Sequence, residues 1–215
     1  MKNMQTSTKS YIFDMDGTLI DSVYALDKSV RTFLDPLQID YPDNIVEIIT
    51  PLGYTGAAEY IQSLGVDMEV DKLTTLMKEG MINEYVESIP AKPFAIDVLK
   101  KLSDEGKKLC ILSASPHFLI DPCVKRLDME KYFDSIWSTD DFCLKKSDTK
   151  IYIEAAKKLG FDVNDCVFVD DNLTNIKTAK AAGMKAIGVY DLTSAASAEE
   201  MKKIADRYIY SFDEF

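Results

Sequence analysis

The chain has 215 residues, of which 47% are hydrophobic and 28% are charged, and its formal net charge is −11 at pH 7. This length exceeds one typical domain but falls short of two, so we expect one core domain with a smaller insertion. The excess of carboxylates would repel nucleic-acid phosphates and anionic membrane surfaces, so we expect neither as a partner.

The first residues, MKNMQTSTKS, are polar and lack the apolar stretch of a signal peptide. Nowhere do about eighteen apolar residues run together, so we expect no membrane span. The four cysteines show no CxxC spacing, and Cys110 and Cys166 lie in apolar runs that suit reduced, buried thiols. We therefore expect a cytoplasmic protein without a disulfide framework or zinc site. We also expect a monomer or weak homodimer.

The first predicted strand, Tyr11–Asp14, is a short apolar run that ends at a carboxylate. Roughly ninety residues separate it from the next strand, far more than the crossover helix that joins a parallel pair. Residues 21–90 contain no convincing strand, but helical patterns cover Val23–Leu34, Gly56–Leu64 and Asp71–Glu87. We predict a helical cap domain over 21–90, inserted into a core domain formed by 1–20 and 91–215 and folded over the carboxyl ends of its sheet.

After residue 90, apolar runs alternate with helical patterns that each end before a glycine. The predicted helices are Ala95–Glu105, Ile151–Leu159 and Asn172–Ala182, and the predicted strands are Lys108–Ser113, Ser135–Ser138, Cys166–Asp170 and Lys185–Tyr190. This alternation, with nearly continuous apolar strands, predicts an α/β fold with a doubly wound, mostly parallel, Rossmann-like sheet.

Three of the predicted strands end in polar residues. Asp14-Met15-Asp16-Gly17-Thr18 closes the first strand, Ser113-Ala114-Ser115 the second, and Asp170-Asp171-Asn172 the fourth. In a parallel sheet these ends lie side by side, at the edge where ligands bind in open α/β folds. Gly17 would let the backbone fold tightly around such a ligand.

In this order, the motifs resemble those of the haloacid dehalogenase superfamily, in particular its phosphoglycolate phosphatase-like members with a helical C1-type cap. The DxDGT signature is matched by Asp14, Asp16, Gly17 and Thr18, the second motif by Ser113, the lysine motif by Lys146, and the acidic fourth motif by Asp170 and Asp171. The matches span nearly the whole chain. The resemblance implies a Mg²⁺-dependent phosphatase that acts on a small phosphorylated metabolite.

The residue types suit this chemistry. Asp14 can attack phosphorus to form an aspartyl-phosphate, which divides one difficult hydrolysis into two easier steps. Asp16 would protonate the departing alkoxide and then activate water. Mg²⁺ prefers hard oxygen ligands, which the Asp14 carboxylate, the Asp16 backbone carbonyl and Asp171 would supply, with Asp170 in a supporting role.

The phosphoryl oxygens also need donors, because phosphoryl transfer is accelerated mainly by positioning and electrostatic stabilisation. The residues expected to bind phosphate are Gly17, Thr18, Ser113, Ala114 and Lys146. The family's lysine precedes a helix with an Ile-Tyr pair, a spacing that Lys146 reproduces, and Lys145 is the alternative. Asn175 stands where some members carry a carboxylate, and we expect it to orient rather than bind the metal. His117, the only histidine, is expected at a rim or helix cap.

Three other functions compete with a phosphatase. A 2-haloacid dehalogenase would not need Asp16, and members resembling β-phosphoglucomutase carry a histidine in the linker where this chain has residues 22–27 without one. A non-catalytic binding module would be expected to lose Asp14 or Lys146. Substrate choice stays open among phosphoglycolate, a sugar phosphate and a nucleoside monophosphate, with residues 51–56 as the expected specificity loop.

Overall fold

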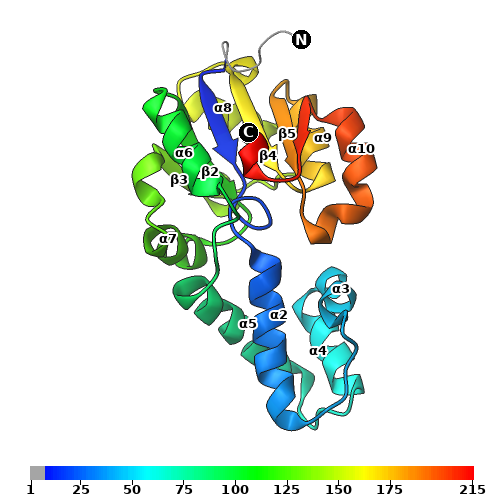
Figure 1. Ribbon diagram of the computed structural model, residues 1–215. Helices are drawn as coiled ribbons and strands as arrows, with labels where there is room; N and C mark the ends of the chain where they lie inside the picture. Colours follow the sequence, from blue (N-terminus) through cyan, green and yellow to red (C-terminus); the bar gives the residue numbers. More distant parts are fainter. Residues whose placement is uncertain (1–7) are drawn as a thin grey trace. The chain divides into compact units, whose positions relative to one another are not determined.

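The computed structural model describes residues 8–215, and the chain divides into two compact units (Figure 1). The core unit contains the chain up to Asp21 together with Pro90–Phe215, and the helical unit is Ser22–Ile89. These divisions lie one residue from the expected boundaries. Each unit has its own buried core, and the placement of the helical unit over the sheet as a cap stays a prediction.

The core unit is built on one six-stranded sheet in the order β3-β2-β1-β4-β5-β6, in which all neighbouring strands are parallel. The strands are β1 (Ser10–Phe13), β2 (Lys108–Ser113), β3 (Ser135–Ser138), β4 (Cys166–Asp170), β5 (Lys185–Val189) and β6 (Arg207–Ile209). This topology confirms the predicted α/β fold with a doubly wound parallel sheet. Phe13 is in register with Ile111 and Val169, so the carboxyl ends of β1, β2 and β4 meet at one edge.

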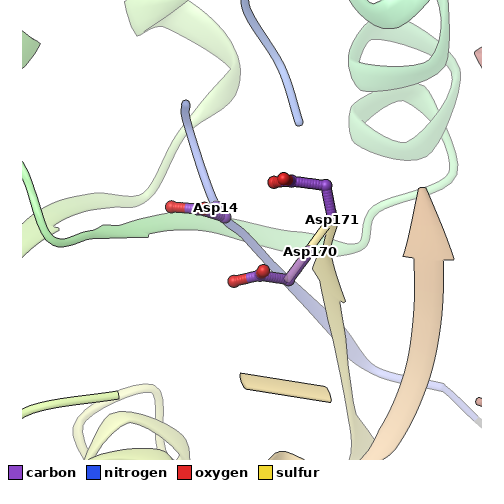
Figure 2. A group of neighbouring side chains, drawn as sticks. All are labelled: Asp14, Asp170 and Asp171. Carbon is purple, nitrogen blue, oxygen red and sulfur yellow. The ribbon is translucent and has the colours of Figure 1, made fainter. Parts of the chain in front are cut away.

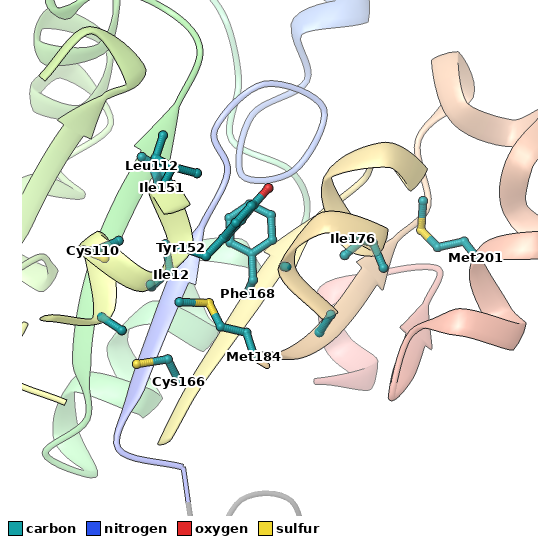
Figure 3. Close-up of a cluster of buried hydrophobic side chains, with 14 residues drawn as sticks. Ile12, Cys110, Leu112, Ile151, Tyr152, Cys166, Phe168, Ile176, Met184 and Met201 are labelled. Atoms are coloured by element: carbon teal, nitrogen blue, oxygen red, sulfur yellow. The ribbon is translucent and has the colours of Figure 1, made fainter. Parts of the chain in front are cut away.

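Helices connect the strands of the core unit. They are α6 (Ala95–Asp104), α7 (His117–Arg126), α8 (Thr149–Lys158), α9 (Leu173–Ala181) and α10 (Ala198–Ile204). On one face of the sheet, Ile12, Cys110 and Phe168 pack against residues of α8 and α9 such as Tyr152 and Ile176 (Figure 3). Right-handed crossovers bring α6 and α7 to the opposite face, because β1, β2 and β3 follow one another toward one edge.

The helical unit consists of α2 (Ser22–Leu34), α3 (Ile45–Ile49), α4 (Gly53–Ser63) and α5 (Val70–Glu87). Its core is formed by apolar residues at helical spacing, including Leu34, Ile61, Leu73 and Met77. Short 3₁₀ turns complete the two units: Asp35–Leu37, Thr50–Leu52, Glu130–Tyr132, Thr139–Phe142, Val163–Asp165, Leu192–Ser197 and Phe212–Glu214.

Among residues 8–215, none of the helices combines the length and the apolar character needed to cross a bilayer. The expectation of no signal peptide concerns the first residues of the chain, and residues 1–7 lie outside the described part.

Candidate active site

Three carboxylates meet where β1 and β4 end. Asp14 directly follows β1, and its backbone N–H donates to the carbonyl of Val169 in β4 at 2.8 Å. Asp170 is the last residue of β4, and Asp171 follows it. One oxygen from each of Asp14, Asp170 and Asp171 lies within 4.8 Å of the others, and all three residues are buried (Figure 2). We call these three residues the carboxylate group.

The loop after β1 folds tightly onto Asp171. The N–H groups of Leu19 and Ile20 donate to the carbonyl of Met15 at 2.9 and 3.0 Å. Thr18 donates its hydroxyl to Oδ1 of Asp171 at 2.9 Å and accepts the backbone N–H of Asp171 at 3.1 Å. Gly17 has φ +74°, and a Cβ there would lie 2.8 Å from Oδ2 of Asp171, so only glycine fits this approach.

Lys146 supplies the positive charge in the site. Its ammonium forms ion pairs with Asp14 and with Oδ2 of Asp170, the latter at 3.1 Å, and the side chain is 6% exposed. Burial acts to lower the pKa of Lys146, but the carboxylates of Asp14 and Asp170 outweigh this effect and raise its pKa above the ordinary value. Lys145 is exposed, so the structure brings Lys146 and not its neighbour into the site.

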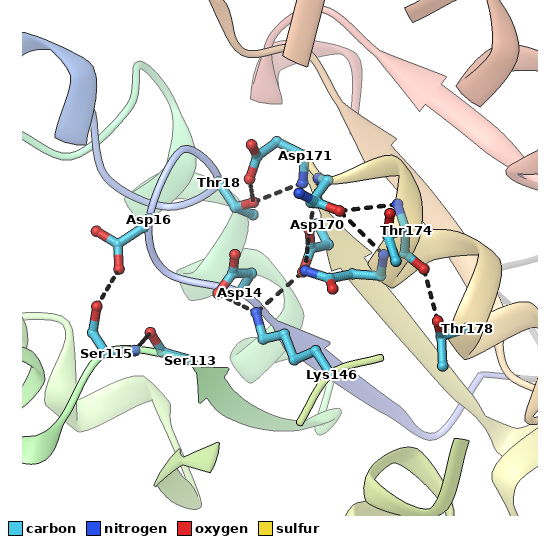
Figure 4. A network of polar contacts seen from close by, with 12 residues as sticks. Asp14, Asp16, Thr18, Ser113, Ser115, Lys146, Asp170, Asp171, Thr174 and Thr178 are labelled. Carbon is cyan, nitrogen blue, oxygen red and sulfur yellow. Dashed lines mark hydrogen bonds and ion pairs between the residues drawn. The ribbon is translucent and has the colours of Figure 1, made fainter. Parts of the chain in front are cut away.

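Asp170 is held by several donors (Figure 4). Its Oδ1 accepts the backbone N–H of Asn172 at 2.7 Å, and its Oδ2 accepts Lys146. The side-chain amide of Asn175 donates to Oδ1 at 3.2 Å and to Oδ2 at 3.0 Å. This arrangement leaves Asp14 and Asp171 as the carboxylates with more lone pairs for a metal, which suits the supporting role expected for Asp170.

The charge balance of the site suits a divalent cation. Three carboxylates and one ammonium, Lys146, give a net charge of −2 when all are ionised. Burial, together with the nearby charges of Asp170 and Asp14, raises the pKa of Asp171 well above its ordinary value. Hard carboxylate oxygens are the ligands that Mg²⁺ prefers, so the residues present fit this ion.

Asp16 lies apart from the carboxylate group. Ser115 donates its hydroxyl to Oδ2 of Asp16 at 2.7 Å, and Figure 4 shows the Asp16 carboxylate directed toward Ser115 rather than toward Asp14. The backbone N–H of Ser115 donates to Oγ of Ser113, the buried last residue of β2, at 3.0 Å. Ala114, between the two serines, is exposed. The second motif therefore contacts the first through Asp16.

The structure adds two residues to the site that the motif matches did not include. Ser115 contacts Asp16, and its only signal in the sequence was a hydroxyl two residues after Ser113. Tyr152 donates its hydroxyl to the carbonyl of Lys146 at 2.8 Å, and its signal was the Ile-Tyr pair after the lysine.

His117 begins α7 and contacts Asp121 at 3.0 Å and Asp141 at 2.8 Å; hydrogen bonds to these two carboxylates raise its pKa.

Comparison with known proteins places this chain in a family. A family profile described as "Haloacid dehalogenase-like hydrolase" matches residues 11–189, most of the chain. This match confirms the resemblance drawn from the motifs.

Individual relatives agree with the profile. A haloacid dehalogenase-like hydrolase domain-containing protein of Arabidopsis thaliana is 32% identical over 134 residues, which cover 61% of this chain and 40% of that protein, so the match spans less than half of the relative. A phosphoglycolate phosphatase of Salmonella choleraesuis is 26% identical over 224 residues, covering 91% of this chain and 88% of that enzyme.

A solved structure supports the fold. The haloacid dehalogenase family hydrolase of Deinococcus radiodurans, which has bound phosphate and sodium, superposes with a TM-score of 0.81 at 18% identity. The superposition covers 97% of this chain and 93% of that one.

Proposed function

The chain belongs to the haloacid dehalogenase-like hydrolase family, and on that premise we propose that it is a Mg²⁺-dependent phosphatase. It hydrolyses a small phosphate monoester through an aspartyl-phosphate formed on Asp14. The observation that carries this proposal is the buried group of Asp14, Asp170 and Asp171 paired with Lys146 at the carboxyl edge of the sheet.

Mg²⁺ would be held by the carboxylates of Asp14 and Asp171 and by the backbone carbonyl of Asp16. Asp170 would support this ligand set through hydrogen bonds or waters. Bound there, Mg²⁺ would offset the negative charge of the phosphoryl oxygens beside the aspartates. The Thr18 hydroxyl fixes the Asp171 carboxylate by a hydrogen bond, and Gly17 leaves room for this carboxylate because it has no side chain.

The chain's own residues carry the bond changes. Lys146, the Ser113 hydroxyl and the backbone around Ala114, Gly17 and Thr18 bind the phosphoryl oxygens. A carboxylate oxygen of Asp14 forms a bond to phosphorus as the bond from phosphorus to the ester oxygen breaks. Asp16 gives a proton to that leaving oxygen, and in the second step it takes a proton from the water that attacks the aspartyl-phosphate.

The substrate is proposed to be a small phosphorylated metabolite in the cytoplasm. Phosphoglycolate is the first candidate, because the Salmonella choleraesuis relative matched over 91% of this chain is named a phosphoglycolate phosphatase. Sugar phosphates and nucleoside monophosphates complete the set to be compared.

Phosphate release from a panel of these monoesters tests the proposal. We expect turnover with Mg²⁺, loss of turnover with EDTA, and recovery when Mg²⁺ is restored. Asp14→Asn, a nearly isosteric change, should lower kcat by more than about 100-fold with an unchanged circular dichroism spectrum, since it removes the covalent nucleophile. Full activity in metal-free buffer, or in Asp14→Asn, would refute the mechanism. An isomerised sugar phosphate without phosphate release would identify a mutase instead.

A further inference from the structure

Tyr152 is a buried tyrosine whose two ends contact different parts of the core unit. It lies in the first turns of α8 and is 0% exposed, and its ring meets the ring of Phe168 edge-on with centroids 4.9 Å apart (Figure 3). Its hydroxyl lies 2.8 Å from the carbonyl of Lys146 and 3.2 Å from the carbonyl of Asn175. One side chain thus contacts β4, the segment before α8, and α9.

The two carbonyls belong to residues whose side chains converge on one carboxylate. Lys146 reaches Oδ2 of Asp170 at 3.1 Å, and the Asn175 amide reaches the same oxygen at 3.0 Å. Lys146 also pairs with Asp14, and its ammonium lies 5.6 Å from the centre of the Phe168 ring on which Tyr152 packs. The backbone positions of Lys146 and Asn175 therefore set where these donors point.

Packing alone does not require the hydroxyl. A phenylalanine would fill the same space against Phe168, whereas a buried phenol oxygen costs desolvation unless it is hydrogen-bonded. Lys146 precedes α8, so its carbonyl lies outside the regular hydrogen bonds of that helix. A lysine has a long, flexible side chain, and a fixed backbone narrows the positions its ammonium can reach.

We propose that Tyr152 is a positioning residue for phosphoryl transfer: its hydroxyl donates to the Lys146 carbonyl, holds the backbone before α8 in place, and so places the Lys146 ammonium against Asp14. This inference rests on the proposed function, because it assumes that Lys146 binds the transferring phosphoryl group. Tyr152 does not touch the substrate and acts through Lys146.

Tyr152→Phe removes only the hydroxyl, and Tyr11→Phe is its matched control. Tyr11 is also buried, at 2% exposure, but lies in β1 with its ring near Phe13 and Phe215. We expect Tyr152→Phe to lower kcat/KM roughly 10-fold or more and to weaken inhibition by inorganic phosphate, because small displacements of positioning groups are costly in rate. Tyr11→Phe should leave both quantities near wild type.

A double-mutant cycle with Lys146→Ala separates positioning from general stability. If Tyr152 acts through Lys146, the effect of Tyr152→Phe on kcat/KM and on phosphate inhibition should largely disappear in the Lys146→Ala background. An equal effect in both backgrounds would overturn the inference, and so would a Tyr152→Phe enzyme that matches Tyr11→Phe. Unfolding of Tyr152→Phe where Tyr11→Phe stays folded would also overturn it, because the hydroxyl would then serve stability. Wild-type and Asp14→Asn enzymes in the same assay test the proposed function separately.

Discussion

Asp170, the last residue of β4, and Asp171, which follows it, both belong to the carboxylate group, yet they have different hydrogen-bond partners. Asp170 faces Lys146 and Asn175, which both donate to it. Asp171 accepts the Thr18 hydroxyl from the loop after β1, and burial, with the neighbouring negative charges, raises its pKa. Burial raises the pKa of Asp170 as well, to about 7, but Asp170 pairs with Lys146 and Asp171 does not. Neutralising Asp170 by substitution therefore removes a counterion of Lys146, and neutralising Asp171 does not.

Asp170→Asn should destabilise the protein, and Asp171→Asn should not. The first change leaves Lys146 with one fewer buried counterion and sets an amide against the amide of Asn175, at a cost of about 2 kcal/mol in the free energy of unfolding. The second removes like-charge repulsion, so metal-free stability should stay equal or rise while Mg²⁺ binding is lost. Urea unfolding and Mg²⁺ titration measure both effects. A stable Asp170→Asn protein beside an unstable Asp171→Asn protein would contradict these assignments.

Ser115 should matter to the proposed acid–base step through Asp16. Without the 2.7 Å hydrogen bond, the Asp16 carboxylate loses a fixed position, and kcat should fall about 10-fold in Ser115→Ala, part of the 10²–10⁴ that a general acid contributes. Mg²⁺ affinity should not change. Ser115→Thr keeps a hydroxyl and is expected to retain most of the activity. Steady-state kinetics that show equal kcat for Ser115→Ala and wild type would remove Ser115 from this role.

At the scale of elements, the loop between β1 and the helical unit is fixed where the backbone of Gly17 comes close to the Asp171 side chain. Gly106 offers a matched comparison, because its φ of +72° resembles the +74° of Gly17 but a Cβ there would meet nothing within 4 Å. We expect Gly106→Ala to cost about 1 kcal/mol of stability from left-handed strain alone, with activity unchanged. Gly17→Ala adds a clash with Asp171, so it should also weaken Mg²⁺ binding.

Thermal unfolding and Mg²⁺ titration of both alanine variants test this comparison. Equal losses of stability in the two variants, with Mg²⁺ affinity intact in both, would show that the contact between Gly17 and Asp171 does not shape the site. The comparison separates backbone strain, which the two positions share, from the contact that only Gly17 makes.

The elements that were predictable from sequence share a clear physical signal. β1, β2 and β4 are buried on both faces, so their residues form continuous apolar runs. The elements that were not predicted lack such a signal. β6 has three residues at the sheet edge, and α3 has five. Asp14 was expected at the end of the first strand, which instead ends at Phe13.

The motif spacing and parallel topology predict that the ends of β1, β2 and β4 lie together, and the structure brings Asp14, Asp170, Asp171 and Lys146 together there. Side-chain directions were not predictable. Whether Asp16 faces Asp14 or Ser115 depends on a rotamer and a hydrogen-bond partner from another strand. Likewise, the contact of the Tyr152 hydroxyl with Lys146 and Asn175 depends on how α8 packs against β4 and α9.

At the scale of the whole molecule, the helical unit is inserted at one point of the core unit. The N–H of Asp21 donates to the carbonyl of Pro90 at 3.0 Å, and Ile20 and Ala91 form an antiparallel bridge. Lys92 anchors the returning segment through a 2.7 Å ion pair with the buried Asp191 after β5. The two crossings are thus adjacent, and the first of them follows the loop whose Gly17 and Thr18 contact Asp171.

The carboxylate group should also shape how the stability of the whole protein depends on pH. Asp171 has a raised pKa, so above its ordinary pKa of about 4 the folded protein binds more protons than the unfolded chain. By linkage, this group lowers the free energy of unfolding as pH rises, until Asp171 ionises in the folded state. Mg²⁺ needs the ionised form, so its stabilising effect should grow over the same range, reaching about 2.7 kcal/mol at 100 times its dissociation constant.

Melting temperatures measured between pH 5 and pH 8, with Mg²⁺ and with EDTA, test this prediction, and Asp171→Asn is the control. The increase in melting temperature caused by Mg²⁺ should be small at the acidic end and larger at the basic end in the wild type. In Asp171→Asn the increase should be small throughout, because the group that exchanges its proton for the metal is absent. In EDTA, the stability of Asp171→Asn relative to wild type should rise with pH, since both proteins must ionise the buried Asp170 but only the wild type must also ionise Asp171. A Mg²⁺ effect that does not change with pH, or that persists in Asp171→Asn, would mean that the metal binds away from this aspartate.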